Sequence, residues 1–166
     1  MNTKTARGIR ALTRGALIAS LYVALTYLAS IFGLSSGVIQ FRISEALTIL
    51  PVFMPEAIPG LFIGCILSNL ITPAVHPLDI VFGSIATLIG ALLTHLLRKL
   101  PEKWKWVATL PPILANAIIV PFVLMFAYGA EGSYFFFMLT VFIGEAVCAG
   151  IGGTLLYLAL RKVKFK

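Results

Sequence analysis

The sequence predicts an all-α integral membrane protein, a bundle of six transmembrane helices with both termini on the cytoplasmic side. Three observations lead to this prediction. Of the 166 residues, 60% are hydrophobic and only 11% are charged, and the mean hydropathy is +1.01. A soluble fold of this length cannot hide so much apolar area from water. The apolar residues also fall into runs near the roughly 20 residues that one membrane crossing needs. We expect a single transmembrane domain over residues 1–166.

The first expected helix follows a basic stretch, a pattern that signal peptides share. However, its apolar run from Ala16 to Phe32 is long, and no small-x-small cleavage site follows it. We therefore expect a membrane helix over this run.

The stretch FRISEALTILPVFMPEAIPG, residues 41–60, is the hardest to place, because charges and prolines interrupt a very apolar region. Proline lacks the amide donor and clashes with the preceding turn, so Pro51, Pro55 and Pro59 predict a turn between two short helices. Glu56 fits the start of the second of them, where the helix dipole favours a carboxylate. Short segments of this kind are tolerated where they border a cavity lined by protein or water.

The basic residues decide the number of spans. They gather in residues 4–14, 98–105 and 161–166, and 12 of the 13 face the same side only if the chain crosses six times. At the ends of apolar runs, the net charge of +7 marks topology and lipid headgroup contact, and it does not favour nucleic-acid binding. The expected helices are approximately 8–32, 43–54, 57–72, 78–98, 107–128 and 134–161.

Polar residues within the apolar runs are the candidate ligand-binding groups, because an ionisable side chain in hydrocarbon is costly and usually faces a cavity. They come from several helices but occupy the outer half or the midplane of the bundle, which predicts a pocket open to the outside. Glu145 is the strongest candidate, since it lies near mid-membrane with no basic residue close in sequence. The predicted substrate-binding residues are Glu145, Asn116, Glu45, Asn69, Arg42 and Tyr128.

Each of these residues also has a structural interpretation. Arg42 and Glu45, three residues apart, can pair on one helix face. Asp79 can cap the fourth helix, and Asn69 and Asn116 can join helices by hydrogen bonds. In a ligand site, carboxylates and carboxamides would accept hydrogen bonds from a heterocycle between apolar walls.

Catalytic and metal-binding motifs are missing from the sequence. It has no GxxxxGK[ST] loop, so the chain cannot hydrolyse ATP alone, and it has no HExxH, GxSxG or metal-ligand cluster. Cys65 and Cys148 are far apart in apolar segments, where packing is their expected role. We expect no enzyme activity, no cofactor and no metal.

Small residues recur every four positions in the first helix, at Ala16, Ser20 and Ala24. Such a stripe lets another helix approach closely, either from a partner protein or from within the bundle.

These features together resemble the substrate-binding S-component of energy-coupling factor (ECF) vitamin transporters. The stretch QFRISEALTILPVFMPEAIPGLFIG, residues 40–64, followed by SNLI, is similar more specifically to the QueT family, proposed to import queuosine precursors. One departure is that the middle position of the small-residue stripe is Ser20 and not alanine.

The resemblance implies a multi-pass protein of the bacterial plasma membrane. Its ligand would be a 7-deazaguanine, such as queuine or a smaller precursor, and its partners an ECF T-component and two ATPase subunits. Glu145 and Asn116 would meet the guanine-like edge, and Glu45 a cationic side group. Loop 33–42 is long enough to move over the pocket. Three alternatives remain open: an S-component for another water-soluble vitamin, a stand-alone channel or secondary transporter, and a membrane scaffold without a ligand.

Overall fold

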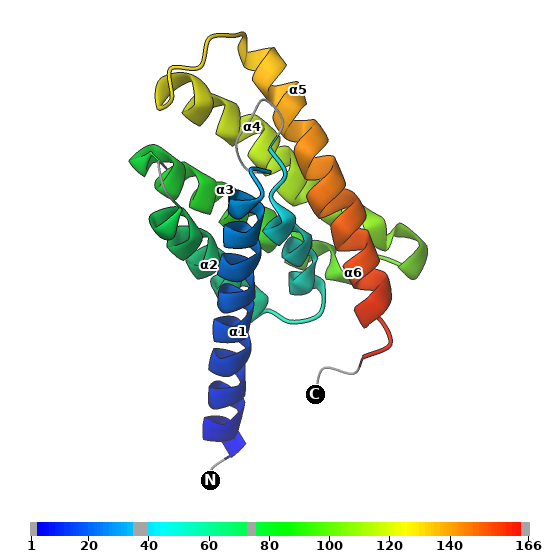
Figure 1. The fold of residues 1–166 in the computed structure, drawn as a ribbon. Helices are drawn as coiled ribbons and strands as arrows, with labels where there is room; N and C mark the ends of the chain where they lie inside the picture. Colours follow the sequence, from blue (N-terminus) through cyan, green and yellow to red (C-terminus); the bar gives the residue numbers. More distant parts are fainter. Residues whose placement is uncertain (1–2, 35–39, 73–75, 164–166) are drawn as a thin grey trace.

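The structure, a computed structural model, describes residues 3–34, 40–72 and 76–163, and this part of the chain is helical without any strand (Figure 1). The predicted all-α class is therefore confirmed. The elements are α1 (Thr3–Ile31), the 3₁₀-helix η1 (Ile43–Val52), α2 (Ala57–Ile71), α3 (Pro77–Leu96), η2 (Leu97–Lys99), η3 (Glu102–Thr109), α4 (Leu110–Phe126), α5 (Tyr134–Glu145), the π-helix η4 (Ala146–Gly152) and α6 (Gly153–Leu160).

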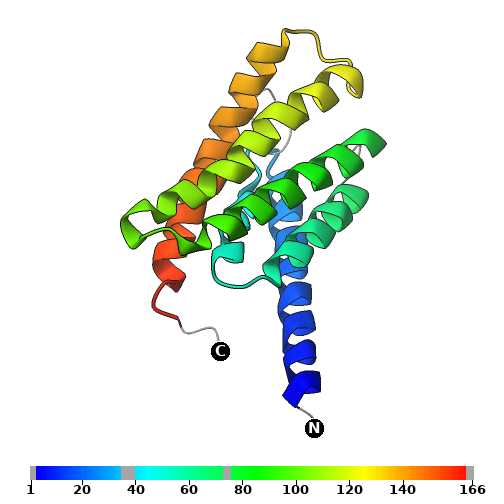
Figure 2. The same ribbon diagram turned by 180° about the vertical axis from the view of Figure 1, so that it is seen from behind.

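Within the described residues, four continuous helical stretches are long and apolar enough to cross a membrane. The two segments around the prolines, η1 and α2, are shorter, so six crossings and a cytoplasmic position of both termini remain predictions. α1 begins and α6 ends at the same end of the bundle (Figures 1 and 2). The four long stretches are Lys4–Ile31, Pro77–Lys99, Glu102–Phe126 and Tyr134–Leu160.

Helices that follow one another in the chain pack side by side, α1 on α2, α2 on α3, α3 on α4 and α4 on α5. The α1–α2 contact depends on glycine. A Cβ added to Gly60 would lie 2.7 Å from the carbonyl oxygen of Gly15, and one added to Gly64 would lie 2.9 Å from the Cβ of Tyr22. Only hydrogen fits at these positions, so the two backbones approach closely.

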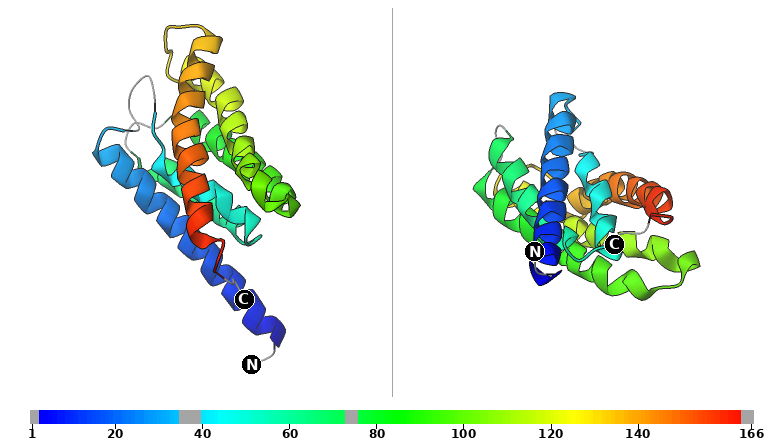
Figure 3. Two further views of the ribbon diagram at one scale, coloured as in Figure 1. Left: turned by 90° about the vertical axis from the view of Figure 1, so that its right-hand side faces the viewer. Right: turned by 90° about the horizontal axis from the view of Figure 1, so that it is seen from below.

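The short helix η1 lies inside the bundle, where it contacts α1, α3, η4 and α6 (Figure 3). Most of its side chains are buried, including Glu45, Leu47 and Ile49. A helix that is apolar on all sides is typical of a protein core. The segment that the sequence made hardest to place is therefore the centre of the fold.

Candidate functional site

Four polar side chains from three parts of the chain meet in the interior beside η1. Arg42 directly precedes η1 and Glu45 lies in its first turn, while Asn116 comes from α4 and Glu145 ends α5. The exposed fraction is 0% for Glu45 and for Asn116 and 5% for Glu145. Sequence analysis nominated all four, and we call them the acid–amide cluster.

The contacts within the acid–amide cluster leave several polar atoms without a partner. The hydroxyl of Tyr22 on α1 donates a hydrogen bond to Oε1 of Glu45. The side chain of Asn116 lies close enough to interact with Glu45 and Glu145, and the charge of Arg42 acts on both acids. However, Oε2 of Glu45, Oε2 of Glu145 and both polar atoms of the Asn116 side chain are buried without an acceptable hydrogen bond.

Unpaired buried polar atoms are expensive, at about 1–3 kcal/mol each. Four of them in one place indicate that the cluster is built for a further polar group. They offer two carboxylate acceptors and one amide that both donates and accepts, a combination suited to a flat heterocycle with several N–H groups.

The space beside the acid–amide cluster is small. A cavity of about 10 Å³ lies against Arg42 and Glu145, with room for about one water molecule. Its other walls are Gln40, Val120 and Val141. A heterocycle cannot enter unless the segment around Arg42 separates from α4 and α5.

An irregular helix holds one acid, and another irregular helix directly follows the other acid. Glu45 lies in a 3₁₀-helix of ten residues, longer than such helices usually run, and Glu145 is followed directly by the π-helix η4. The two irregular segments contact each other, and a Cβ added to Gly152 would lie 3.1 Å from the Cβ of Ala46. π-Helical turns occur frequently at functional sites because they alter the direction of the side chains around them.

A second polar network lies next to the acid–amide cluster and shares Arg42 with it. Nη2 of Arg42 lies 3.5 Å from Oδ2 of Asp79 on α3. The hydroxyl of Tyr128 donates to the same oxygen at 3.4 Å and accepts from the backbone N–H of His76 at 3.0 Å. Nδ2 of Asn69 donates to the backbone oxygen of Asp79 at 3.4 Å. This network joins α2, α3, the end of α4 and the start of η1.

The structure thus divides the predicted substrate-binding residues into two groups. Arg42, Glu45, Asn116 and Glu145 form the acid–amide cluster. Asn69 and Tyr128 contact Asp79 instead, and Tyr128 is 43% exposed. Their roles toward a ligand remain predictions.

Two structural interpretations from the sequence are wrong. The suggested ion pair between Arg42 and Glu45 does not form, because Arg42 pairs with Asp79 and Glu45 accepts from Tyr22. Asp79 does not cap α3, whose N-terminal backbone donates at 3.2 Å, from the N–H of Leu78, to the side chain of His76.

Tyr22 is a hydrogen-bonding partner of the acid–amide cluster that the sequence did not indicate. It is 1% exposed and lies in the first helix, on a different face from the exposed small-residue stripe. Tyrosine is enriched at membrane–water interfaces, and nothing in the local sequence distinguishes a buried hydroxyl from an interfacial one.

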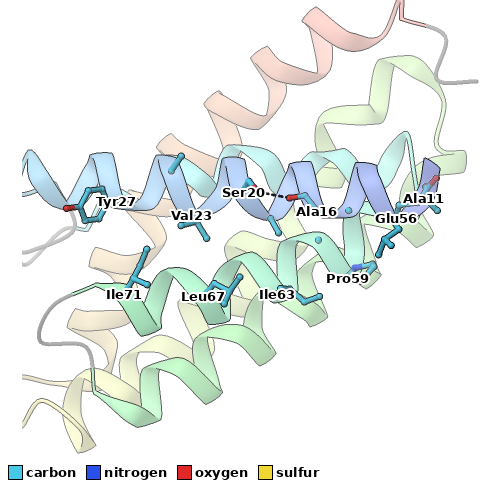
Figure 4. Close-up of a pocket in the computed structure, with 15 residues that line it drawn as sticks. Ala11, Ala16, Ser20, Val23, Tyr27, Glu56, Pro59, Ile63, Leu67 and Ile71 are labelled. Carbon is cyan, nitrogen blue, oxygen red and sulfur yellow. Dashed lines mark hydrogen bonds between the residues drawn. The ribbon is translucent and has the colours of Figure 1, made fainter. Parts of the chain in front are cut away.

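The small-residue stripe of α1 faces outward. Ala16, Ser20 and Ala24 are exposed and line an apolar groove of about 950 Å³ between α1 and α2 (Figure 4). The hydroxyl of Ser20 donates to the backbone oxygen of Ala16 at 2.9 Å, so it presents little polarity to the groove. Gly15 and Ala19, beside the stripe, also line the groove and pack against α2.

Residues 35–39 of the predicted lid loop 33–42 lie outside the described residues, so the lid remains untested.

Two comparisons with known proteins show which proteins this chain is similar to. The family described as QueT transporter matches residues 12–162. The chain is also 35% identical over 92 residues to the protein named queuosine precursor transporter QueT of Lactococcus lactis subsp. cremoris (strain MG1363). That alignment covers 55% of this chain and 53%, about half, of the relative. No solved structure matches significantly.

The family match extends over most of the chain, from the first helix to the end of α6, and includes all four residues of the acid–amide cluster. Together with the apolar helices, it identifies a multi-pass protein of the cell membrane. The chain belongs to the QueT transporter family.

Proposed function

We propose that this chain is the substrate-binding S-component of an ECF-type importer and takes up queuosine precursors, either queuine or a related 7-deazaguanine. The observation that carries the proposal is the acid–amide cluster, with four unpaired polar atoms inside a membrane protein of the QueT family. The name of the Lactococcus lactis relative supports the same substrate class.

The chemistry of the cluster fits such a ligand. A 7-deazaguanine presents N–H donors and a carbonyl along one edge. Glu145 and the amide of Asn116 would meet this edge, and Glu45 would meet a cationic side group. Ligand binding would then give the unpaired atoms hydrogen-bond partners and remove their free-energy penalty.

Binding would require a change of shape, since the cavity of about 10 Å³ is far smaller than a purine-like ring. Arg42 belongs to both the acid–amide cluster and the Asp79 network, so it is the contact that must move as the ligand enters. We propose that ligand binding breaks or rearranges the 3.5 Å contact between Arg42 and Asp79.

Energy for uptake would come from partner subunits, because the sequence has no ATP-binding loop. The groove with Ala16, Ser20 and Ala24 would receive the T-component, which would be joined to two ATPases. A surface of small residues suits close approach of another transmembrane helix.

The proposal is tested by ligand binding to the purified chain. We expect queuine or a smaller 7-deazaguanine to copurify or to raise the melting temperature, and Glu145→Gln to weaken binding by at least about 1.5 kcal/mol, the value of a charged hydrogen bond. Glu131→Gln makes the same change on an exposed residue and should bind as the wild type does. Unchanged binding by Glu145→Gln would refute the role of that residue.

The same assay separates the alternatives. If another water-soluble vitamin stabilises the chain and no 7-deazaguanine does, the S-component role stands with a different ligand. Uptake into vesicles that contain this chain alone would indicate a stand-alone transporter and overturn the S-component role.

A further inference from the structure

A second apolar groove lies on the surface of the bundle, near the end where both termini lie. It has a volume of about 400 Å³ and runs between η3 and α4 on one wall and α5, η4 and α6 on the other. We call it the α4–α6 groove. Its lining residues are Trp106, Thr109, Leu110, Ile113, Phe142, Ala146, Gly150, Ile151, Thr154 and Leu155.

The lining of the α4–α6 groove suits a flexible hydrocarbon chain. Its large side chains are exposed, with Ile151 at 60%, Leu155 at 62% and Phe142 at 39%. Along η3 and the start of α4 the groove extends from Trp106 to Ile113, roughly 10 Å at the rise of a helix. The α1–α2 groove differs, since small residues line its α1 wall and would admit a whole helix.

In the sequence, a lysine lies beyond each wall of the groove, three residues before Trp106 and seven residues after Leu155. In a 3₁₀-helix, residues three apart share a face, so Lys103 lies on the same side of η3 as Trp106. On the other wall, Lys162 lies two residues beyond the end of α6, and its neighbour Arg161 pairs with Glu102, the residue before Lys103. Both lysines are exposed, and within the described part of the chain neither has an ion-pair partner.

The acid near this end of the groove already has a cationic partner, and Lys105 already has a hydrogen-bond acceptor. Oε1 of Glu102 lies 3.6 Å from Nη1 of Arg161, and its Oε2 accepts from the hydroxyl of Tyr157 at 2.6 Å. The ammonium group of Lys105 donates to the backbone oxygen of Arg98. The acid of η3 is thus paired within the protein, and Lys103 and Lys162 are without an ion-pair partner among the described residues.

We propose that the α4–α6 groove binds an anionic phospholipid, with an acyl chain along the apolar lining and the phosphate between Lys103 and Lys162. Trp104 and Trp106, whose ring centroids lie 6.4 Å apart, are 49% exposed each and mark the depth of the membrane interface. Lysine near an anionic headgroup strengthens binding, and an apolar groove beneath it adds chain contact.

The experiment compares two lipids with the same acyl chains. The purified full-length chain in detergent is titrated with phosphatidylglycerol and with phosphatidylcholine, and bound lipid is counted by native mass spectrometry. We expect retention of phosphatidylglycerol over phosphatidylcholine. The double variant Lys103→Ser/Lys162→Ser should weaken phosphatidylglycerol binding about thirtyfold, since each lysine near an anionic surface contributes about fivefold.

Two further variants separate the groove from general charge. Arg7→Ser/Arg10→Ser removes two charges from α1 at the same end of the bundle and should leave phosphatidylglycerol binding within about twofold, because neither residue borders the groove. Gly150→Leu fills the groove without changing charge and should weaken binding of both lipids. An added Cβ at Gly150 meets only Ile113 Cδ1, at an ordinary 3.4 Å, so a side chain fits there. Ala146→Leu serves the same purpose if Gly150→Leu does not fold.

Equal binding of the two lipids would overturn the proposal. So would an equal loss in the arginine variant, or unchanged lipid binding in both groove-filling variants. If those groove-filling variants instead disrupt assembly with a protein partner and leave lipid binding intact, the occupant is a protein helix and the lipid site is wrong.

Discussion

The acid–amide cluster and the α1–α2 groove are opposites in size and in chemistry. The groove measures about 950 Å³ and is almost entirely apolar, while the space beside the cluster is about 10 Å³ and its surroundings hold unpaired polar atoms. In a membrane protein, a large apolar groove is filled by lipid or by another helix without cost. Neither lipid nor an apolar helix can donate a hydrogen bond to a buried unpaired carboxylate. Unpaired polar atoms therefore indicate the candidate ligand site better than cavity volume does.

The largest expected effect concerns Asn116. Asn116→Leu should reduce 7-deazaguanine binding about a hundredfold, because about two hydrogen bonds to the ligand are lost. The same change should raise the stability of the ligand-free protein by about 1 kcal/mol, since it removes a buried amide that has no hydrogen bond. Calorimetry and thermal unfolding in detergent measure the two quantities. A loss of stability without a loss of binding would make Asn116 a structural residue.

The next effect concerns the α1–α2 groove. Ser20→Trp places a large side chain on the exposed stripe, so transport by the assembled system should fall about tenfold or more while ligand binding to the isolated chain stays unchanged. Leu17→Trp is the matched control, because Leu17 is 59% exposed on α1 but does not line the groove. An equal loss of transport in both variants would show that the groove is not the docking surface of the partner.

A smaller effect should come from the glycine contact beneath the groove. Gly60→Ala forces a Cβ to within 2.7 Å of the Gly15 carbonyl oxygen and should cost about 1–3 kcal/mol of stability. Gly8→Ala meets nothing within 4 Å and should stabilise α1 by about 0.5–1 kcal/mol. Thermal unfolding of the two variants measures the change in stability of each. If both variants are stabilised, the contact between α1 and α2 at Gly60 has room for a Cβ.

The smallest effect is expected at Tyr128, outside the acid–amide cluster. Tyr128→Phe removes the hydrogen bonds to Asp79 and His76 and should cost about 1 kcal/mol. Burial raises the pKa of the Tyr128 hydroxyl. The hydroxyl therefore remains a donor at neutral pH, and its contribution is lost only as the pH rises above the ordinary tyrosine value of about 10. Unfolding measured from pH 6 to pH 9 should give a constant difference between variant and wild type, whereas a difference that shrinks within this range would contradict the assignment.

Much of the candidate site could be predicted from the sequence, because burying a polar side chain in a membrane costs free energy and so singles out its members. Glu145, Asn116 and Glu45 stand in apolar runs where a polar side chain needs a reason, and all three meet in the interior. Tyr22 could not be predicted, since its contact joins α1 to η1 across 23 residues. The partner of Arg42 was misassigned for the same reason, because local spacing favours Glu45 over an acid on another helix.

The sequence by itself determined that this chain is helical and lies in a membrane, since its apolar composition permits no other solvent and its runs match a bilayer in length. It also determined which polar side chains lie in apolar runs, where their burial costs free energy unless they have a polar partner or ligand. Only the tertiary structure decided which of those side chains meet, which way the stripe of α1 faces, and that the proline-rich segment forms the centre of the bundle. These outcomes depend on contacts between distant helices, which local sequence patterns do not specify.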